Sequence, residues 1–145
     1  KFSVLSPLTQ AQREYWTHPN YNNELNKLEQ AFDNDLPDYW PRFMEEMNIK
    51  EGTVSWTNIA PGNVVPVHTD KFYKLRKKYN VTEDECIRYL MFLQDWELGQ
   101  MVEFEEKILT RWKKGDVWSF GINDSHWAAN GTQDNFITCQ INTFN

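Results

Sequence analysis

Apolar residues in the first third of the chain recur at helical spacing. Leu25, Leu28 and Phe32 are three or four positions apart and share one face of a helix expected over residues 22–32. Shorter helices are expected over residues 8–13 and 39–47, and Pro41 falls in the first turn of the latter, where proline is tolerated. The pattern therefore predicts that residues 1–50 form helices that support the rest of the domain.

From residue 51 onward, β-branched and aromatic residues form short runs separated by turn signals. The runs cover residues 53–59, 64–67, 87–94, 101–104, 108–112, 117–120 and 135–144. Pro61-Gly62, Leu98-Gly99 and Asn130-Gly131 are typical of the turns between such strands. Because helices do not alternate with the runs, an all-β sandwich or barrel is favoured over a parallel α/β sheet. Residues 71–79 are the exception, because they form a basic amphipathic segment that is expected to be either a helix or a long loop. This segment is either a solvated insertion between strands or a lip over a site.

Length, charge and cysteine content narrow the class of protein. The chain has 145 residues, so one domain is expected. Its net charge is -6, so we expect no nucleic-acid partner. No apolar run approaches the roughly 18 residues of a membrane span, and the first ten residues lack the pattern of a signal peptide. Cys86 and Cys139 are too few and too far apart for a disulfide scaffold. We therefore expect a cytoplasmic protein with buried thiols and no membrane partner, its oligomeric state left open.

Histidine is scarce, which limits the choice of metal ligands to His18, His68 and His126. His68 and Asp70 are two positions apart after a short strand, and strand alternation points both side chains to one side. With His126 on a distant segment, they match the pattern of two histidines and one carboxylate that holds Fe(II) and leaves coordination positions open. The pair alone is a weak signal, because about 0.4 such pairs are expected by chance in this composition. An exposed turn pair, with His126 bonded to a backbone carbonyl, is the alternative.

A wider pattern surrounds these three residues. Residues 61–70 read PGNVVPVHTD, residues 112–120 read WKKGDVWSF and residues 123–126 read NDSH. Together, residues 55–144 resemble the double-stranded β-helix (jelly-roll) Fe(II)/2-oxoglutarate dioxygenases, and most of all the short aspartyl/asparaginyl β-hydroxylase-type proteins. The resemblance implies a mainly β, cupin-like jelly-roll barrel over residues 51–145, with the N-terminal helices packed outside it in a single domain of residues 1–145.

The resemblance also implies a role for individual residues. His68, Asp70 and His126 would bind the iron, and no catalytic residue is expected beyond these ligands. The residues that would hold 2-oxoglutarate are Arg88, Thr57, Tyr89 and Thr138. The residues that would line the substrate pocket are Trp56, Trp118 and Trp127.

The chain departs from the family in one respect. Most members carry an Arg or Lys shortly after the distal histidine, where it pairs with the far carboxylate of 2-oxoglutarate, but no Lys or Arg follows Lys114 here. Arg88 is the natural substitute, because a carboxylate buried in a barrel without a cationic partner is costly.

The function that the resemblance implies is an oxygenase requiring Fe(II), 2-oxoglutarate and O2. It would hydroxylate a peptide side chain or a small metabolite and release succinate and CO2. Two alternatives stay open: a cupin-like metal-binding protein without 2-oxoglutarate chemistry, and a metal-free, aromatic-rich β-sandwich that binds a sugar or a partner protein.

Overall fold

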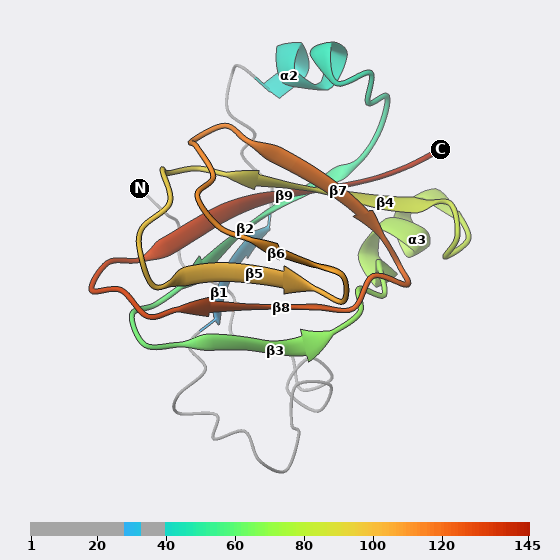
Figure 1. Ribbon diagram of the computed structural model, residues 1–145. Helices are drawn as coiled ribbons and strands as arrows, with labels where there is room; N and C mark the ends of the chain where they lie inside the picture. The colour runs from blue at the N-terminus through green and yellow to red at the C-terminus, as the bar shows by residue number, and fades with distance from the viewer. Residues whose placement is uncertain (1–27, 33–39) are drawn as a thin grey trace.

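Two antiparallel sheets face each other and enclose the interior of the protein in a computed structural model (Figure 1). The structure describes residues 28–32 and 40–145, and the side chains of residues 42–145. The larger sheet has the strand order β1-β2-β9-β4-β7, and the smaller has the order β3-β8-β5-β6. Consecutive strands repeatedly change sheet, so the expected mainly β, two-layered barrel is confirmed.

The bounds of the elements follow the runs of β-branched and aromatic residues. The strands are β1 (Leu28–Phe32), β2 (Thr53–Ile59), β3 (Val64–His68), β4 (Cys86–Phe92), β5 (Gln100–Phe104), β6 (Lys107–Leu109), β7 (Val117–Gly121), β8 (His126–Asn130) and β9 (Phe136–Phe144). The helices are α2 (Trp40–Glu46) and α3 (Tyr73–Tyr79). Among these described elements, neither helix is long and apolar enough to cross a membrane.

Glycine marks two of the tight turns. Gly62 and Gly115 have φ values of +75° and +93°, in the left-handed region that glycine adopts without steric cost. Gly62 follows Pro61 and joins β2 to β3, so the Pro-Gly signal correctly indicates this turn.

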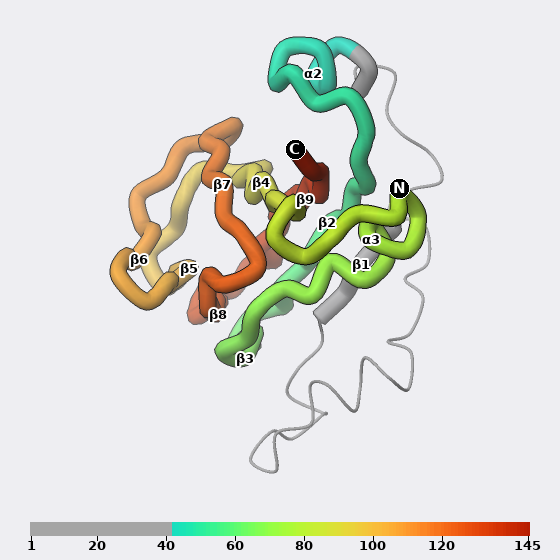
Figure 2. The backbone as a smooth tube through the Cα atoms, turned by 90° about the vertical axis from the view of Figure 1, so that its right-hand side faces the viewer, coloured from blue at the N-terminus to red at the C-terminus, as the bar shows by residue number. Residues whose placement is uncertain are grey.

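The outer face of the larger sheet is covered by α2 and the residues after it. Alternate residues of a strand point to opposite faces, and Val54 and Ile141 point outward. They pack against Phe43, Met44 and Met47. Figure 2, an end-on view, places α2 on the side of the larger sheet away from the smaller one. The expected packing of an N-terminal helix outside the barrel is confirmed for α2.

The space between the sheets has an apolar end and a polar end. At the apolar end, Trp112 stacks on Phe92 and Phe136, with ring centroids 4.0 and 5.2 Å apart. Side chains from both sheets complete this core. At the other end, hydroxyl, amide, imidazole and charged groups point inward. The buried imidazole and charged groups therefore lie at one end of the barrel.

Two expectations about local structure were wrong, and one strand was missing from the expected runs. Residues 28–32, expected to end a helix over 22–32, form β1, because their backbone pairs with the edge of β2, Leu28 opposite Ile59. The expected strand over 108–112 ends at Leu109, and Arg111 has a φ of +60°. Strand β8 was not among the expected runs; Ala128, Ala129 and Asn130 have low β propensity, but the strand pairs on both sides, with β3 and β5. Residues 8–13 and 22–27 lie outside the described part of the chain.

Candidate metal site

The pairing of β3 with β8 brings the two distant histidines together. His68, the last residue of β3, lies opposite His126, the first residue of β8. The register shifts between Val65 and His68, a bulge-like irregularity. Regular alternation from buried Val65 would turn Val67 inward, yet Val67 is 66% exposed and His68 faces the interior. The irregularity therefore aims His68 at the site.

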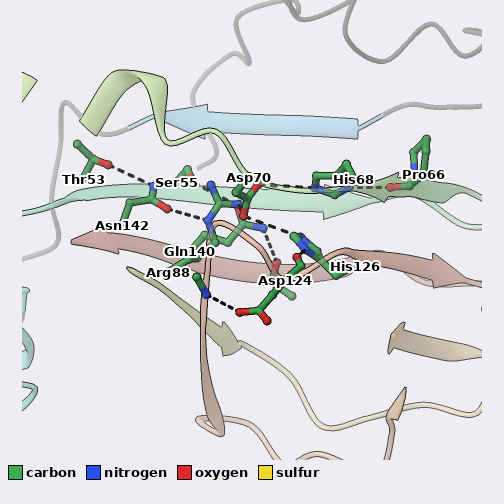
Figure 3. Close-up of polar contacts among 12 residues, drawn as sticks. Thr53, Ser55, Pro66, His68, Asp70, Arg88, Asp124, His126, Gln140 and Asn142 are labelled. Carbon is green, nitrogen blue, oxygen red and sulfur yellow. Dashed lines mark hydrogen bonds and ion pairs between the residues drawn. The ribbon is translucent and has the colours of Figure 1, made fainter. Parts of the chain in front are cut away.

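Asp70 follows β3 directly and completes a group of three metal-binding side chains. Its Oδ1 atom lies 3.7 Å from His68 Nε2, and its Oδ2 atom lies 3.9 Å from His126 Nε2. One ligand atom from each residue lies within 4.8 Å of the other two, a spacing that a single ion can bridge. Figure 3 shows the three side chains pointing toward one another from β3, the loop after it and β8.

Backbone carbonyls set the tautomer of both imidazoles. His68 Nδ1 lies 2.7 Å from the carbonyl oxygen of Pro66, and His126 Nδ1 lies 2.9 Å from that of Asp124. A carbonyl oxygen only accepts hydrogen bonds, so each Nδ1 carries the proton and donates it. Each Nε2 then has its lone pair directed toward Asp70, which is the arrangement a metal-binding histidine needs.

Burial keeps both histidines neutral. It lowers the pKa of His68 to about 4, and the nearby His126 adds to the effect. Burial also lowers the pKa of His126, although Asp70 opposes that shift. At neutral pH the lone pairs of both Nε2 atoms are therefore available to a cation without first losing a proton.

The metal-free protein is expected to lose stability as the pH falls from about 6.5 to about 4. In this window, the unfolded chain binds a proton at His68 and the folded chain does not, so acid favours the unfolded state. Thermal unfolding in the presence of a chelator, followed across this range, measures the effect. His68→Gln should show a shallower decline than the wild type, and identical pH profiles would contradict the assignment.

Arg88 is buried against the carboxylate of Asp70. Its Nη1 lies 2.9 Å from Asp70 Oδ2, an ion pair that is not aligned as a hydrogen bond, while its Nε donates to Asn142 Oδ1 at 2.7 Å. The two charged side chains are only 15% and 9% exposed. Burial lowers the pKa of Arg88, and Asp70 opposes this shift. An arginine still remains protonated at neutral pH.

Two other residues expected to hold 2-oxoglutarate lie side by side in the interior, where Thr138 is opposite Phe92 of the apolar core. Thr57 on β2 is directly opposite Thr138 on β9, and both are 4% exposed. Thr57 Oγ1 is buried and has no hydrogen-bond partner among the described residues. Tyr89, by contrast, packs in the outer cluster with α2, away from this pair.

The three tryptophans expected in a pocket are dispersed. Trp56 packs in the same outer cluster as Tyr89. Trp118 packs against the interior core, and Lys107 Nζ lies 4.0 Å from the centroid of its ring. Trp127 adjoins His126 in β8, so strand alternation turns it to the opposite face.

Sequence reasoning missed four polar residues on the inward faces of β2 and β9. Asn142 holds Arg88 and also donates to Thr53 Oγ1 at 3.2 Å. Gln140 accepts from Ser55 Oγ at 3.3 Å. The available signal was the alternation of polar residues at 53, 55 and 57 and at 138, 140 and 142. This alternation identifies a polar face on each strand, although it does not say which face is inside.

The donor set fits a divalent cation of the borderline or hard type. Two neutral imidazoles and one carboxylate converge, and Oδ1 of Asp70, the oxygen that is not ion-paired with Arg88, faces His68 Nε2 at 3.7 Å. The two cysteines lie elsewhere, Cys139 in the outer cluster and Cys86 beside α3. Such nitrogen and oxygen ligands are typical of Fe(II) or Mn(II) sites rather than of thiolate-rich zinc sites.

Comparison with known proteins identifies the fold. No protein-family model and no curated protein matches the sequence. Among solved structures, the cupin domain of Schizosaccharomyces pombe Cnp3 has a TM-score of 0.52 at 13% identity, over 88% of this chain and 71% of that one. A predicted oxalate decarboxylase from Thermotoga maritima has a TM-score of 0.51 at 14% identity, over 81% of each chain. The fold is that of a cupin.

A third cupin supports the same assignment. The cupin domain of a transcriptional regulator from Enterobacter cloacae has a TM-score of 0.51 at 10% identity, over 81% of this chain and 97% of that one. At these identities, the likeness establishes the double-stranded β-helix fold and nothing about the reaction. The chemistry of this protein must therefore be argued from His68, Asp70 and His126 themselves.

Proposed function

We propose that this cupin is a mononuclear Fe(II)-dependent oxygenase that uses 2-oxoglutarate as co-substrate. One atom of O2 would enter a peptide side chain or a small metabolite as a hydroxyl, and the other would enter succinate, with release of CO2. The observation that carries the proposal is the convergence of two imidazole Nε2 atoms and one carboxylate at the polar end of the interior. Such a triad leaves positions on the ion open for a co-substrate and O2.

The chain's own side chains would hold the ion and orient its ligands. His68, Asp70 and His126 would bind Fe(II), which supplies the O2 chemistry when bound. The third guanidinium nitrogen of Arg88, Nη2, is the group that a co-substrate carboxylate would contact, since Nε and Nη1 already face Asn142 and Asp70. Thr57 and Thr138 would offer hydroxyls farther along the interior, toward Phe92.

A second candidate function is a metal-dependent cupin reaction without 2-oxoglutarate. The observation that favours it is the charge balance of the interior: Arg88 is already paired with Asp70, and the neighbouring polar side chains of β2 and β9 are neutral. A dicarboxylate would therefore leave one carboxylate without a cationic partner, which costs free energy in a buried site.

The protein incubated with Fe(II), 2-oxoglutarate and O2 is expected to release succinate, even without its substrate, through uncoupled turnover. Succinate is quantified over time against an Asp70→Asn variant, which lacks the carboxylate ligand. Fe(II) binding without succinate formation would favour the second candidate. Protein that binds no Fe(II) or Mn(II) would instead support a metal-free binding module.

A further inference from the structure

Arg88 belongs to a chain of contacts that ends on the carboxylate of Asp70. Asn142 Nδ2 donates to Thr53 Oγ1 at 3.2 Å, and Asn142 Oδ1 accepts from Arg88 Nε at 2.7 Å. The chain of contacts thus crosses the neighbouring strands β2, β9 and β4 of the larger sheet and reaches the loop after β3 of the smaller sheet. A rigid sheet therefore fixes the position of a side chain that touches the candidate metal site.

The aromatic ring of Phe72 holds the guanidinium from another direction. The Cζ atom of Arg88 lies 5.5 Å from the centroid of this ring, within the range of a cation–π contact. Phe72 is buried and has a φ of +48°, an uncommon backbone conformation for a bulky residue. Arg88 thus has three partners, Asp70, Asn142 and Phe72, and little freedom to move.

The ion pair gives the two carboxylate oxygens of Asp70 different surroundings. Oδ1 lies 3.7 Å from His68 Nε2, while Oδ2 lies 2.9 Å from Arg88 Nη1 and 3.9 Å from His126 Nε2, so Oδ2 faces the site but is in ion-pair contact with the guanidinium. An ion that took both oxygens would share Oδ2 with the guanidinium, and two cations on one buried oxygen repel each other strongly. Buried ion pairs seldom add net stability, so a positional role is the better physical reason for this one.

We propose that Arg88 restricts Asp70 to a single-oxygen ligand and thereby keeps one more coordination position open on the bound ion. This inference rests on the proposed metal site but not on the identity of the reaction. An octahedral ion held by His68, His126 and Oδ1 alone has about three positions for exogenous ligands. If both carboxylate oxygens bound, only about two would remain, too few for a two-atom chelator together with O2.

Counting the water molecules on bound Mn(II) tests the inference without any assay of activity. Water-proton relaxation is measured for the wild type and for Arg88→Gln, each loaded with Mn(II). We expect about three exchangeable waters in the wild type and about two in the variant, a loss of about one third in inner-sphere relaxation. Arg76→Gln is the matched control, because Arg76 is ion-paired with Glu83 at a more exposed position, and it should keep the wild-type value.

The possible results separate the inference from the proposed function. Equal hydration of the wild type and Arg88→Gln would overturn the role of Arg88 and leave the metal site intact. A wild type that binds no Mn(II) would overturn both. Loss of a water in Arg76→Gln as well would also contradict the inference, because the effect would not be specific to Arg88.

A measurement on the unmodified protein covers the case in which Arg88→Gln does not fold. The side-chain N–H groups of Arg88 are followed by ¹⁵N NMR before and after loading with Cd(II), a diamagnetic ion that readily takes both oxygens of a carboxylate. We expect slowly exchanging guanidinium signals in both states, since the contact with Oδ2 persists. Their disappearance on loading would show that the ion has displaced Arg88, and the inference would fail.

Discussion

Replacing Asp70 with alanine is expected to lower the free energy of unfolding of the metal-free protein by about 3–5 kcal/mol. The change leaves the guanidinium of Arg88 buried without its counter-charge, and no other carboxylate pairs with Arg88 in the described part of the chain. Chemical denaturation of the wild type and the variant, both with a chelator present, measures the difference. Metal binding should be lost in the same variant, because the carboxylate ligand is gone.

Asp95→Ala is the matched control for this prediction. Asp95 pairs with Lys113 at 3.7 Å and accepts a hydrogen bond from the backbone N–H of Lys114 at 2.9 Å, but the side chains of the ion pair are 64% and 78% exposed. Exposed ion pairs contribute about 1 kcal/mol or less, so this variant should remain close to the wild type. A similar loss in the two variants would show that the pair between Asp70 and Arg88 is not buried as described.

Replacing His126 with glutamine is expected to weaken Mn(II) binding by more than about 100-fold, since changing a residue that merely orients a ligand already costs 10- to 100-fold. The amide keeps much of the side-chain volume against Phe120, whose ring centroid is 4.7 Å from that of His126, so the fold should survive. Isothermal titration of the metal into the variant measures the affinity, and circular dichroism checks the fold.

His18→Gln provides the control within the same chain, as a matched substitution at the remaining histidine. Its Mn(II) affinity should equal that of the wild type. If His126→Gln binds Mn(II) as tightly as the wild type does, the ion is not held by the proposed triad, and the oxygenase proposal loses its basis.

Much of the β architecture could be predicted from local pattern. The β-branched and aromatic runs at 53–59 and 135–144 correspond closely to β2 and β9, and Pro61-Gly62 marks a real turn. The prediction failed where pairing decides the conformation. Residues 28–32 have helical spacing, yet the exposed edge of β2 offers a partner for their backbone. Residues 128–130 have weak β propensity, yet they lie between β3 and β5.

The orientation of β2 and β9 shows why the interior could not be predicted. Each strand has an apolar and a polar face, and burial of the apolar face inside a barrel is the simplest expectation. The structure instead packs Val54 and Ile141 against α2 and turns Ser55 and Asn142 inward. The face that turns inward depends on packing against a helix elsewhere in the chain. The alternation of residues within a strand carries no information about that helix.

The sequence by itself identified His68, Asp70 and His126 as candidate ligands, because histidine is scarce and two of the three residues lie two positions apart, and the resemblance to the dioxygenases strengthened that weak signal. Three-dimensional packing alone decided that His126 lies opposite His68, that both Nε2 atoms face Asp70 and that Arg88 lies against its carboxylate. The physical reason is the range of the interactions. Side-chain periodicity acts over a few residues, whereas strand pairing and the burial of charge join residues that are far apart in the chain.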